Sequence, residues 1–231
     1  MESTRTNNVT FARQILRLSL RFNAFWRYRI LWVGDSHAMF MRKGLRQQLG
    51  NHESIASLLY WIGPRLMFSV SKSGFPSTRF FRLFVAVWKP RVLVISLGEI
   101  DIRMFLSDPS RRSSVWVEEY LRKVSEFCDE LKINNVHLLT SIPISDLPQQ
   151  DQIQSVGTVS ERLDGFSWLQ SELTVLVARE EFRSKIYVLN LQNCLSDKIG
   201  KLDSKFTDDG IHVNARGAWE VWNTVSKQIY K

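Results

Sequence analysis

The chain has 231 residues, enough for one large domain or two small ones, and 44% of them are hydrophobic, so it can bury a sizeable core. This composition excludes disordered and collagen-like classes. Two cysteines, Cys128 and Cys194, are too few for a disulfide framework or a four-cysteine zinc site, and we expect reduced thiols in a cytoplasm-like compartment. The net charge of +8 either indicates an anionic partner or only keeps the protein soluble.

The excess positive charge is concentrated at the amino terminus. The first 29 residues hold six Arg and a single Glu, a net charge of +5, which leaves +3 for the rest of the chain. Apolar residues recur at steps of three and four between Phe11 and Trp26, so residues 1–27 are predicted to form a basic amphipathic arm. Such an arm can lie on an anionic membrane surface, or it can dock on the domain or on a partner protein. Nucleic-acid binding is not expected, because little charge remains outside the arm and no nucleic-acid module is recognisable.

The arm does not have the pattern of a signal peptide, because arginines interrupt its apolar positions about every four residues. A transit peptide would also be rich in Arg, so that alternative stays open. No stretch approaches the ~18 consecutive apolar residues that a membrane-spanning helix requires. We therefore expect a cytoplasmic protein, with peripheral membrane attachment through the arm as the alternative.

From residue 28 onward, strand-like and helix-like segments alternate. The predicted strands are residues 28–33, 55–62, 91–97, 136–141 and 185–191. The predicted helices are residues 38–49, 77–88, 113–132, 163–182 and 214–230, with a polar loop or lid at 145–157. Because the strands are apolar throughout, they indicate a sheet covered on both faces. We expect a flavodoxin-like, three-layer α/β/α domain over residues 28–231, with a mainly parallel five-stranded sheet and an active site beyond the carboxyl ends of its strands.

The first candidate motif, Gly34-Asp35-Ser36-His37, directly follows the first predicted strand. A serine at a strand-to-helix turn has its hydroxyl at the edge of the sheet and its backbone N–H at a helix amino terminus, where that N–H can bind a developing oxyanion. The alternative is that Asp35 or Ser36 only caps the helix. His37, beside the serine, either lines the pocket or belongs to the helix start.

The second motif, Asp209-Gly210-Ile211-His212, precedes the last predicted helix. A carboxylate three residues before a histidine can accept a hydrogen bond from one imidazole nitrogen, which leaves the other nitrogen free to act as a base toward a serine. In isolation, an Asp-x-x-His sequence is more often a capped turn with a packed histidine.

Together, these two motifs and the sheet between them resemble the SGNH (GDSL) hydrolase superfamily. Residues 34–37 are similar to the first block of that family and residues 206–214 to its last, and the resemblance covers residues 28–231. It implies that Ser36 is the nucleophile, His212 the general base and Asp209 the carboxylate that orients His212.

A third block differs from the usual family pattern. The family typically has Gly-x-Asn-Asp after the third strand, and its Asn side chain donates to the oxyanion, whereas Ile100 stands at that position here and cannot donate. The block resembles a GEIDxR variant of bacterial polysaccharide-linked relatives. Losing one oxyanion-hole donor typically costs ~10²–10³ in turnover.

Charged residues crowd this third block. Arg103 could neutralise Glu99 and Asp101 or bind an anionic group of the substrate, although a surface ion pair is the alternative. We assign Asp35, His37, Glu99, Asp101 and Arg103 to substrate binding.

The resemblance also implies a second oxyanion donor, the backbone N–H of a glycine after the second strand. Gly63 is the better candidate because it closes an apolar run, and Gly74 is the alternative. His52 and His137 have no partner at ligand spacing, and the two cysteines lie 66 residues apart, so we expect no metal and no cofactor. Exposed aromatic residues could stack on sugar rings, although core packing is the commoner role; the candidates are Trp61, Phe75 and Trp168.

Two functional hypotheses follow. The first is a serine esterase that removes O-acetyl or similar acyl groups from a carbohydrate or polysaccharide through a Ser-His-Asp triad and an acyl-enzyme. The second is a catalytically weak or inactive protein of the same fold that binds glycan or serves in polysaccharide biosynthesis, and Ile100 favours it.

Overall fold

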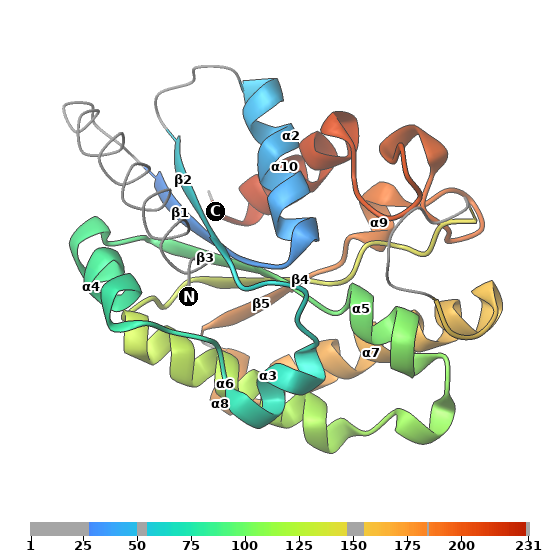
Figure 1. Cartoon of the computed structure of the whole chain (residues 1–231), viewed down its shortest axis with the longest axis horizontal. Helices are drawn as coiled ribbons and strands as arrows, with labels where there is room; N and C mark the ends of the chain where they lie inside the picture. Colours follow the sequence, from blue (N-terminus) through green and yellow to red (C-terminus); the bar gives the residue numbers. More distant parts are fainter. Residues whose placement is uncertain (1–27, 50–54, 147–154, 184, 230–231) are drawn as a thin grey trace, which may run out of the picture.

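The computed structural model describes residues 28–49, 55–146, 155–183 and 185–229 (Figure 1). The predicted arm (residues 1–27), most of the predicted loop (147–154) and His52 lie outside the described residues.

Five strands form one sheet in the order β2-β1-β3-β4-β5, and every neighbouring pair is parallel. The strands are β1 (Tyr28–Gly34), β2 (Ile55–Trp61), β3 (Val92–Ser96), β4 (Val136–Leu139) and β5 (Ile186–Leu189). They confirm all five predicted strands, and the sheet is entirely rather than mainly parallel. Gly34 pairs with Trp61 on one side and Ser96 on the other, so three strands end at the same level. We call this end of the sheet its carboxyl edge.

Helices cover both faces of the sheet, as the prediction of three layers requires (Figure 1). One layer consists of α2 (Ser36–Leu49), α9 (Gln192–Leu195) and α10 (Ala215–Ile229). The other consists of α3 (Met67–Ser73), α4 (Arg79–Trp88), α6 (Ser114–Leu131), α7 (Val159–Val177) and α8 (Glu180–Arg183). Successive residues of β1 point to opposite faces, so Leu31 and Val33 are buried in one core and Ile30 and Trp32 in the other.

The structure corrects the predicted helices in two ways: one predicted helix is divided, and several short helices were not predicted. The single helix predicted over 163–182 is two helices, α7 and α8, and α7 starts earlier because Thr158 and Glu161 form a capping box at its amino terminus. Helices α3 and α9 were not predicted, nor was the helical segment after β3, which consists of α5 (Glu99–Asp101) and a π-helical turn (Ile102–Leu106). All of them are short, so they carry too little periodicity to be recognised in the sequence. Within the described ranges, no helix has the length and apolar character needed to cross a bilayer.

Candidate active site

Ser36 lies at the carboxyl edge of the sheet, in the turn from β1 into α2. Gly34 permits this turn, because a Cβ there would lie 2.3 Å from the carbonyl oxygen of Ser96 on β3. The Asp35 carboxylate accepts the backbone N–H of His37 at 2.9 Å and caps α2. Ser36 is the first residue of α2, so its own N–H has no acceptor inside the helix.

His212 joins Ser36 to Asp209. Its Nε2 lies 3.0 Å from Ser36 Oγ, and its Nδ1 lies 2.7 Å from Asp209 Oδ2. The second carboxylate oxygen of Asp209 accepts the backbone N–H groups of Ile211 and His212 at 2.8 and 2.7 Å. Thr207 stabilises the turn between Asp209 and His212, because its Oγ1 accepts the Gly210 N–H at 2.9 Å. The structure therefore brings the three residues of the predicted triad into one hydrogen-bonded chain.

The surroundings of His212 and Asp209 set the protonation states that these hydrogen bonds require. Burial and the nearby charge of His37 lower the pKa of His212, so the imidazole is neutral and can accept a proton at neutral pH. Burial raises the pKa of Asp209, but hydrogen bonds from the backbone and ring of His212 outweigh it and bring that pKa to about 2. Asp209 is therefore ionised and holds Nδ1 of His212 as the donor, which leaves Nε2 to accept from Ser36.

Two aromatic rings fix the plane of His212. Phe40 stacks on it with ring centroids 4.2 Å apart at an interplanar angle of 17°, and the His37 ring lies 5.0 Å away. Phe40 was not singled out in the sequence. It stands four residues after Ser36 in α2, so the spacing of neighbours on one helix face was the signal that could have identified it.

A second, buried cluster lies directly beside the triad. His37 Nε2 is 3.3 Å from Glu99 Oε2, and Arg103 Nη2 donates to the same oxygen at 2.9 Å. All three side chains are almost completely buried. Burial lowers the pKa of His37, but the charges of Asp35 and Glu99 outweigh it and raise that pKa above its usual value. The acidic residues around His37 thus favour its protonated form.

The remaining predicted substrate-binding residues have other contacts. Asp35 is fully buried, and burial raises the pKa of its carboxyl group. Asp101 faces α3, where its two carboxylate oxygens accept the N–H groups of Met67 and Phe68 at 2.7 and 3.1 Å. The structure therefore gives Asp35 and Asp101 the role of helix caps and does not bring Asp101 into contact with the triad.

The two glycines proposed as oxyanion donors differ in their surroundings. Gly63 follows β2, and the preceding Ile62 N–H donates to Gly34 O at 3.0 Å, so this loop runs beside the turn that holds Ser36. A Cβ at Gly63 would meet nothing within 4 Å, so its backbone borders open space. The N–H of Gly74 instead donates to Val70 O at 2.8 Å and closes α3. Gly63 is therefore the better placed donor of the two.

The described residues hold no group of three His, Cys, Asp or Glu side chains that could bind a metal ion. His137 on β4 stacks on Tyr187, and burial lowers its pKa to about 4. Cys128 is a buried free thiol and Cys194 a partly buried one.

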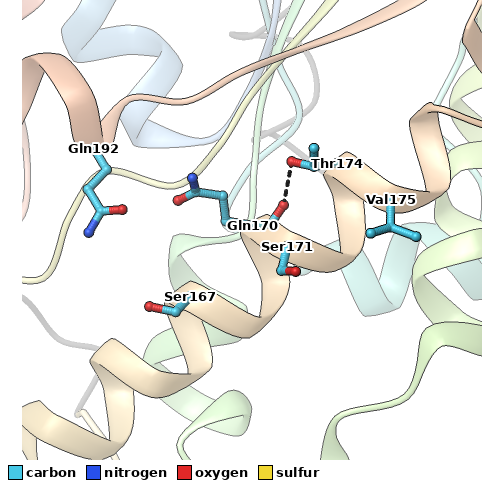
Figure 2. Close-up of a pocket in the computed structure, with 6 residues that line it drawn as sticks. All are labelled: Ser167, Gln170, Ser171, Thr174, Val175 and Gln192. Carbon is cyan, nitrogen blue, oxygen red and sulfur yellow. Dashed lines mark hydrogen bonds between the residues drawn. The ribbon is translucent and has the colours of Figure 1, made fainter.

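A hollow of about 250 Å³ lies away from these residues, between α7 and the start of α9 (Figure 2). Hydroxyl and amide groups line most of it; the residues are Ser167, Gln170, Ser171, Thr174, Val175 and Gln192. Ser36 and His212 are absent from this lining, and both side chains are partly buried.

Comparison with known proteins identifies the architecture. No protein-family model and no curated protein sequence matches the chain. Among solved structures, it is similar to a GDSL-like lipase from Bacteroides thetaiotaomicron, with 16% identity, a TM-score of 0.58, and 95% of this chain and 98% of that chain covered. It is also similar to an aryl esterase from M. smegmatis (14% identity, TM-score 0.55, 88% and 98% covered) and a carbohydrate acetylesterase from Sinorhizobium meliloti (11%, 0.52, 88% and 98%). The fold of the chain is that of the SGNH (GDSL) hydrolases.

Proposed function

We propose that the protein is an SGNH-type serine esterase that removes O-acetyl or similar acyl groups from a carbohydrate. The observation that carries this proposal is the chain of contacts from Ser36 Oγ through His212 to Asp209, at 3.0 and 2.7 Å. Nucleophile, base and orienting carboxylate are each within hydrogen-bond distance of the next, which is the arrangement that activates a serine for acyl transfer.

In the proposed reaction, Ser36 Oγ attacks the acyl carbonyl carbon while His212 Nε2 takes the hydroxyl proton. The tetrahedral intermediate collapses, and His212 returns this proton to the departing sugar oxygen, which leaves the acyl group on Ser36. Water then attacks the acyl-enzyme with His212 again as base, and the products are a carboxylic acid and regenerated Ser36. Asp209 stays ionised throughout and stabilises the imidazolium that forms twice in each cycle.

The backbone N–H groups of Ser36 and Gly63 are the proposed oxyanion donors. Ile100, at the position where relatives of this fold typically have Asn, is 95% buried, and its apolar side chain has no hydrogen-bond donor. Since one such donor is worth ~10²–10³ in turnover, we expect a slow esterase rather than an inactive one.

The carbohydrate part of the proposal is supported by an exposed aromatic ring near the site. Trp61, the last residue of β2, is 59% exposed and stands two residues before Gly63. Phe75 and Trp168, the other two candidates, are partly buried against the core. An exposed indole can stack on the face of a sugar ring. One structurally similar protein is itself a carbohydrate acetylesterase.

The competing proposal is a protein of the same fold that binds glycan without efficient hydrolysis. The observation in its favour is Ile100 together with the carboxylate of Glu99 close to His37.

Replacing Ser36 with Ala distinguishes the two proposals. Hydrolysis of p-nitrophenyl acetate and of an acetylated xylooligosaccharide should fall by about 10⁴-fold or more in kcat, because the residual rate depends on oxyanion binding alone. If the wild-type protein binds the oligosaccharide in calorimetry and hydrolyses neither substrate faster than Ser36→Ala does, the esterase proposal is wrong and the binding protein is correct.

A further inference from the structure

A buried group of three ionisable side chains lies beside the triad and has no role in the reaction proposed above. It consists of His37 on α2 and of Glu99 and Arg103 on the helical segment after β3. Glu99 Oε2 accepts from Arg103 Nη2 at 2.9 Å and lies 3.3 Å from His37 Nε2. The side chains of His37, Glu99 and Arg103 are only 4%, 7% and 2% exposed. Such burial leaves little surface for contact with a substrate, although all three were predicted to bind one.

Stability alone does not account for this buried group. Removing charged side chains from water has a large desolvation cost, and well-packed apolar residues in the same place are often equally stable or more stable. Glu118 and Arg122 on α6 have the same spacing as Glu99 and Arg103, but their side chains are 24% and 51% exposed, so water still solvates them. Buried ionisable groups beside a base are typical of functional sites. The position of the group next to His212 therefore indicates a role in the reaction.

His37 connects the buried group to His212. The two ring centroids lie 5.0 Å apart, at an interplanar angle of 36°. Phe40 also contacts the His212 ring, with centroids 4.2 Å apart, but it carries no charge. A carboxylate oxygen that accepts from a guanidinium also accepts from an imidazole N–H, so Glu99 fixes the hydrogen on Nε2 of His37 and the direction of that ring. The ring that lies beside His212 is thus oriented by Glu99.

We propose that Glu99 is a positioning residue that acts on His212 through His37. Arg103 fixes the Glu99 carboxylate, and Glu99 fixes the His37 ring and stabilises a positive charge on it. That charge favours the neutral form of His212, which is the form that takes the proton from Ser36. The proposal rests on the proposed function, because it takes His212 as the base.

Glu99 has two opposite effects on His212. Burial lowers the pKa of His37, but the charges of Asp35 and Glu99 outweigh it. Burial and then the charge of His37 lower the pKa of His212, whereas the charge of Glu99 raises it directly. The proposal states that the effect through His37 is the larger one. Other charged groups also act on this set from the neighbouring elements; they are Asp35, Arg103, Arg162 and Asp209.

Titration of the histidine imidazoles by NMR tests the proposal. The chain has four histidines, so replacing them one at a time assigns their signals. In Glu99→Gln, the titration midpoint of His37 should move to lower pH and that of His212 to higher pH, because His37 loses its carboxylate partner. If Glu99 acted only through its own charge, the midpoint of His212 would move to lower pH instead. The sign of the His212 shift therefore distinguishes the two effects.

Three further variants sharpen this test. Glu118→Gln is the matched control, because it removes the exposed pair on α6 and should leave both midpoints unchanged. Glu99→Asp keeps a carboxylate for Arg103 but withdraws it from His37 by one methylene, so it should also move the His212 midpoint to higher pH and serves if Glu99→Gln does not fold. In a His37→Gln background, Glu99→Gln should no longer raise the His212 midpoint, because the residue through which it acts is gone.

The pH dependence of hydrolysis gives a second readout. The acidic limb of kcat/KM for p-nitrophenyl acetate should move to higher pH in Glu99→Gln and stay in place in Glu118→Gln. A His212 midpoint that is unchanged or lower in Glu99→Gln and Glu99→Asp would overturn the proposal, as would an equal upward shift with and without His37. The NMR midpoints require no turnover. A wild-type protein that shows the expected midpoints but hydrolyses no ester would contradict the proposed function and leave the coupling of Glu99 to His212 intact, so the two proposals can fail separately.

Discussion

At the scale of residues, the contact between Ser36 and His212 joins positions 176 apart in the sequence. Each motif alone was compatible with a simple cap or turn, and only their combined resemblance to the SGNH hydrolases implied that Ser36 is the nucleophile, His212 the base and Asp209 the orienting carboxylate. The sequence could not show that Glu99 bonds to both His37 and Arg103, or that Asp101 is directed away from the site. Such contacts depend on side-chain directions that no spacing rule determines.

The hydrogen bonds of Asp209 predict a large and specific effect of removing its charge. Asp209→Asn should lower kcat for p-nitrophenyl acetate by about 10⁴-fold, because an amide no longer holds Nδ1 of His212 as the donor. Asp208→Asn is the matched control. Asp208 is exposed and accepts only from Asn214 at 3.0 Å in the described contacts, so its loss should leave kcat within a few-fold of wild type. Comparable losses in the two variants would mean that Asp209 has no special role.

The charge of His37 predicts a shift in the pH dependence. His212 must be neutral to act as a base, so kcat/KM should be constant at high pH and fall as the pH drops through the lowered pKa of His212. His37→Gln removes a cation that lowers this pKa, so the acidic limb should move to higher pH. His137→Gln removes a histidine on β4 outside the site and should not move the limb. If the acidic limb of the kcat/KM profile stays in place or moves to lower pH in His37→Gln, His37 does not lower the pKa of His212.

At the scale of elements, α3 depends on a residue far away in the sequence. Asp101, 34 positions after Met67, accepts the first N–H groups of this seven-residue helix, and no side chain of α3 itself provides that cap. Sequence reading missed α3 for this reason: a short helix capped from a distance shows neither a local cap nor sustained periodicity. The five strands were predictable because continuous apolar runs bounded by Gly or Pro are typical of a parallel sheet.

Removal of this cap should destabilise the protein. Asp101→Ala is expected to lower the free energy of unfolding in urea by about 1–3 kcal/mol, because it leaves two N–H groups of α3 without acceptors. Asp108→Ala removes a comparable cap from the exposed turn Pro109–Arg111 and should cost about 1 kcal/mol or less. If Asp101→Ala is no less stable than Asp108→Ala, the capping role assigned to Asp101 is wrong.

At the scale of the whole molecule, the layers, the strand count and the position of the candidate site were predictable from the alternation of apolar strands and amphipathic helices. The exposed side of α4 was not. The sequence shows helical spacing of the Phe, Leu and Val residues in this segment, and only the exposed fractions, such as 59% for Leu83 and 73% for Val87, separate the outer residues from the buried ones. The sequence likewise gives the number of basic residues but not their positions on the molecule. In the structure, Arg29 at the start of β1 lies beside Arg91, which follows α4.

The central claim is that Ser36 is an activated nucleophile, and covalent labelling with a fluorophosphonate followed by peptide mapping tests it most directly. The wild-type protein should gain one adduct, located on the peptide that contains Ser36, and Ser36→Ala should gain none. His212→Ala should react far more slowly, since the serine loses its base. No adduct on the wild-type protein under conditions that label a known serine esterase, or equal labelling of Ser36→Ala, would contradict the account.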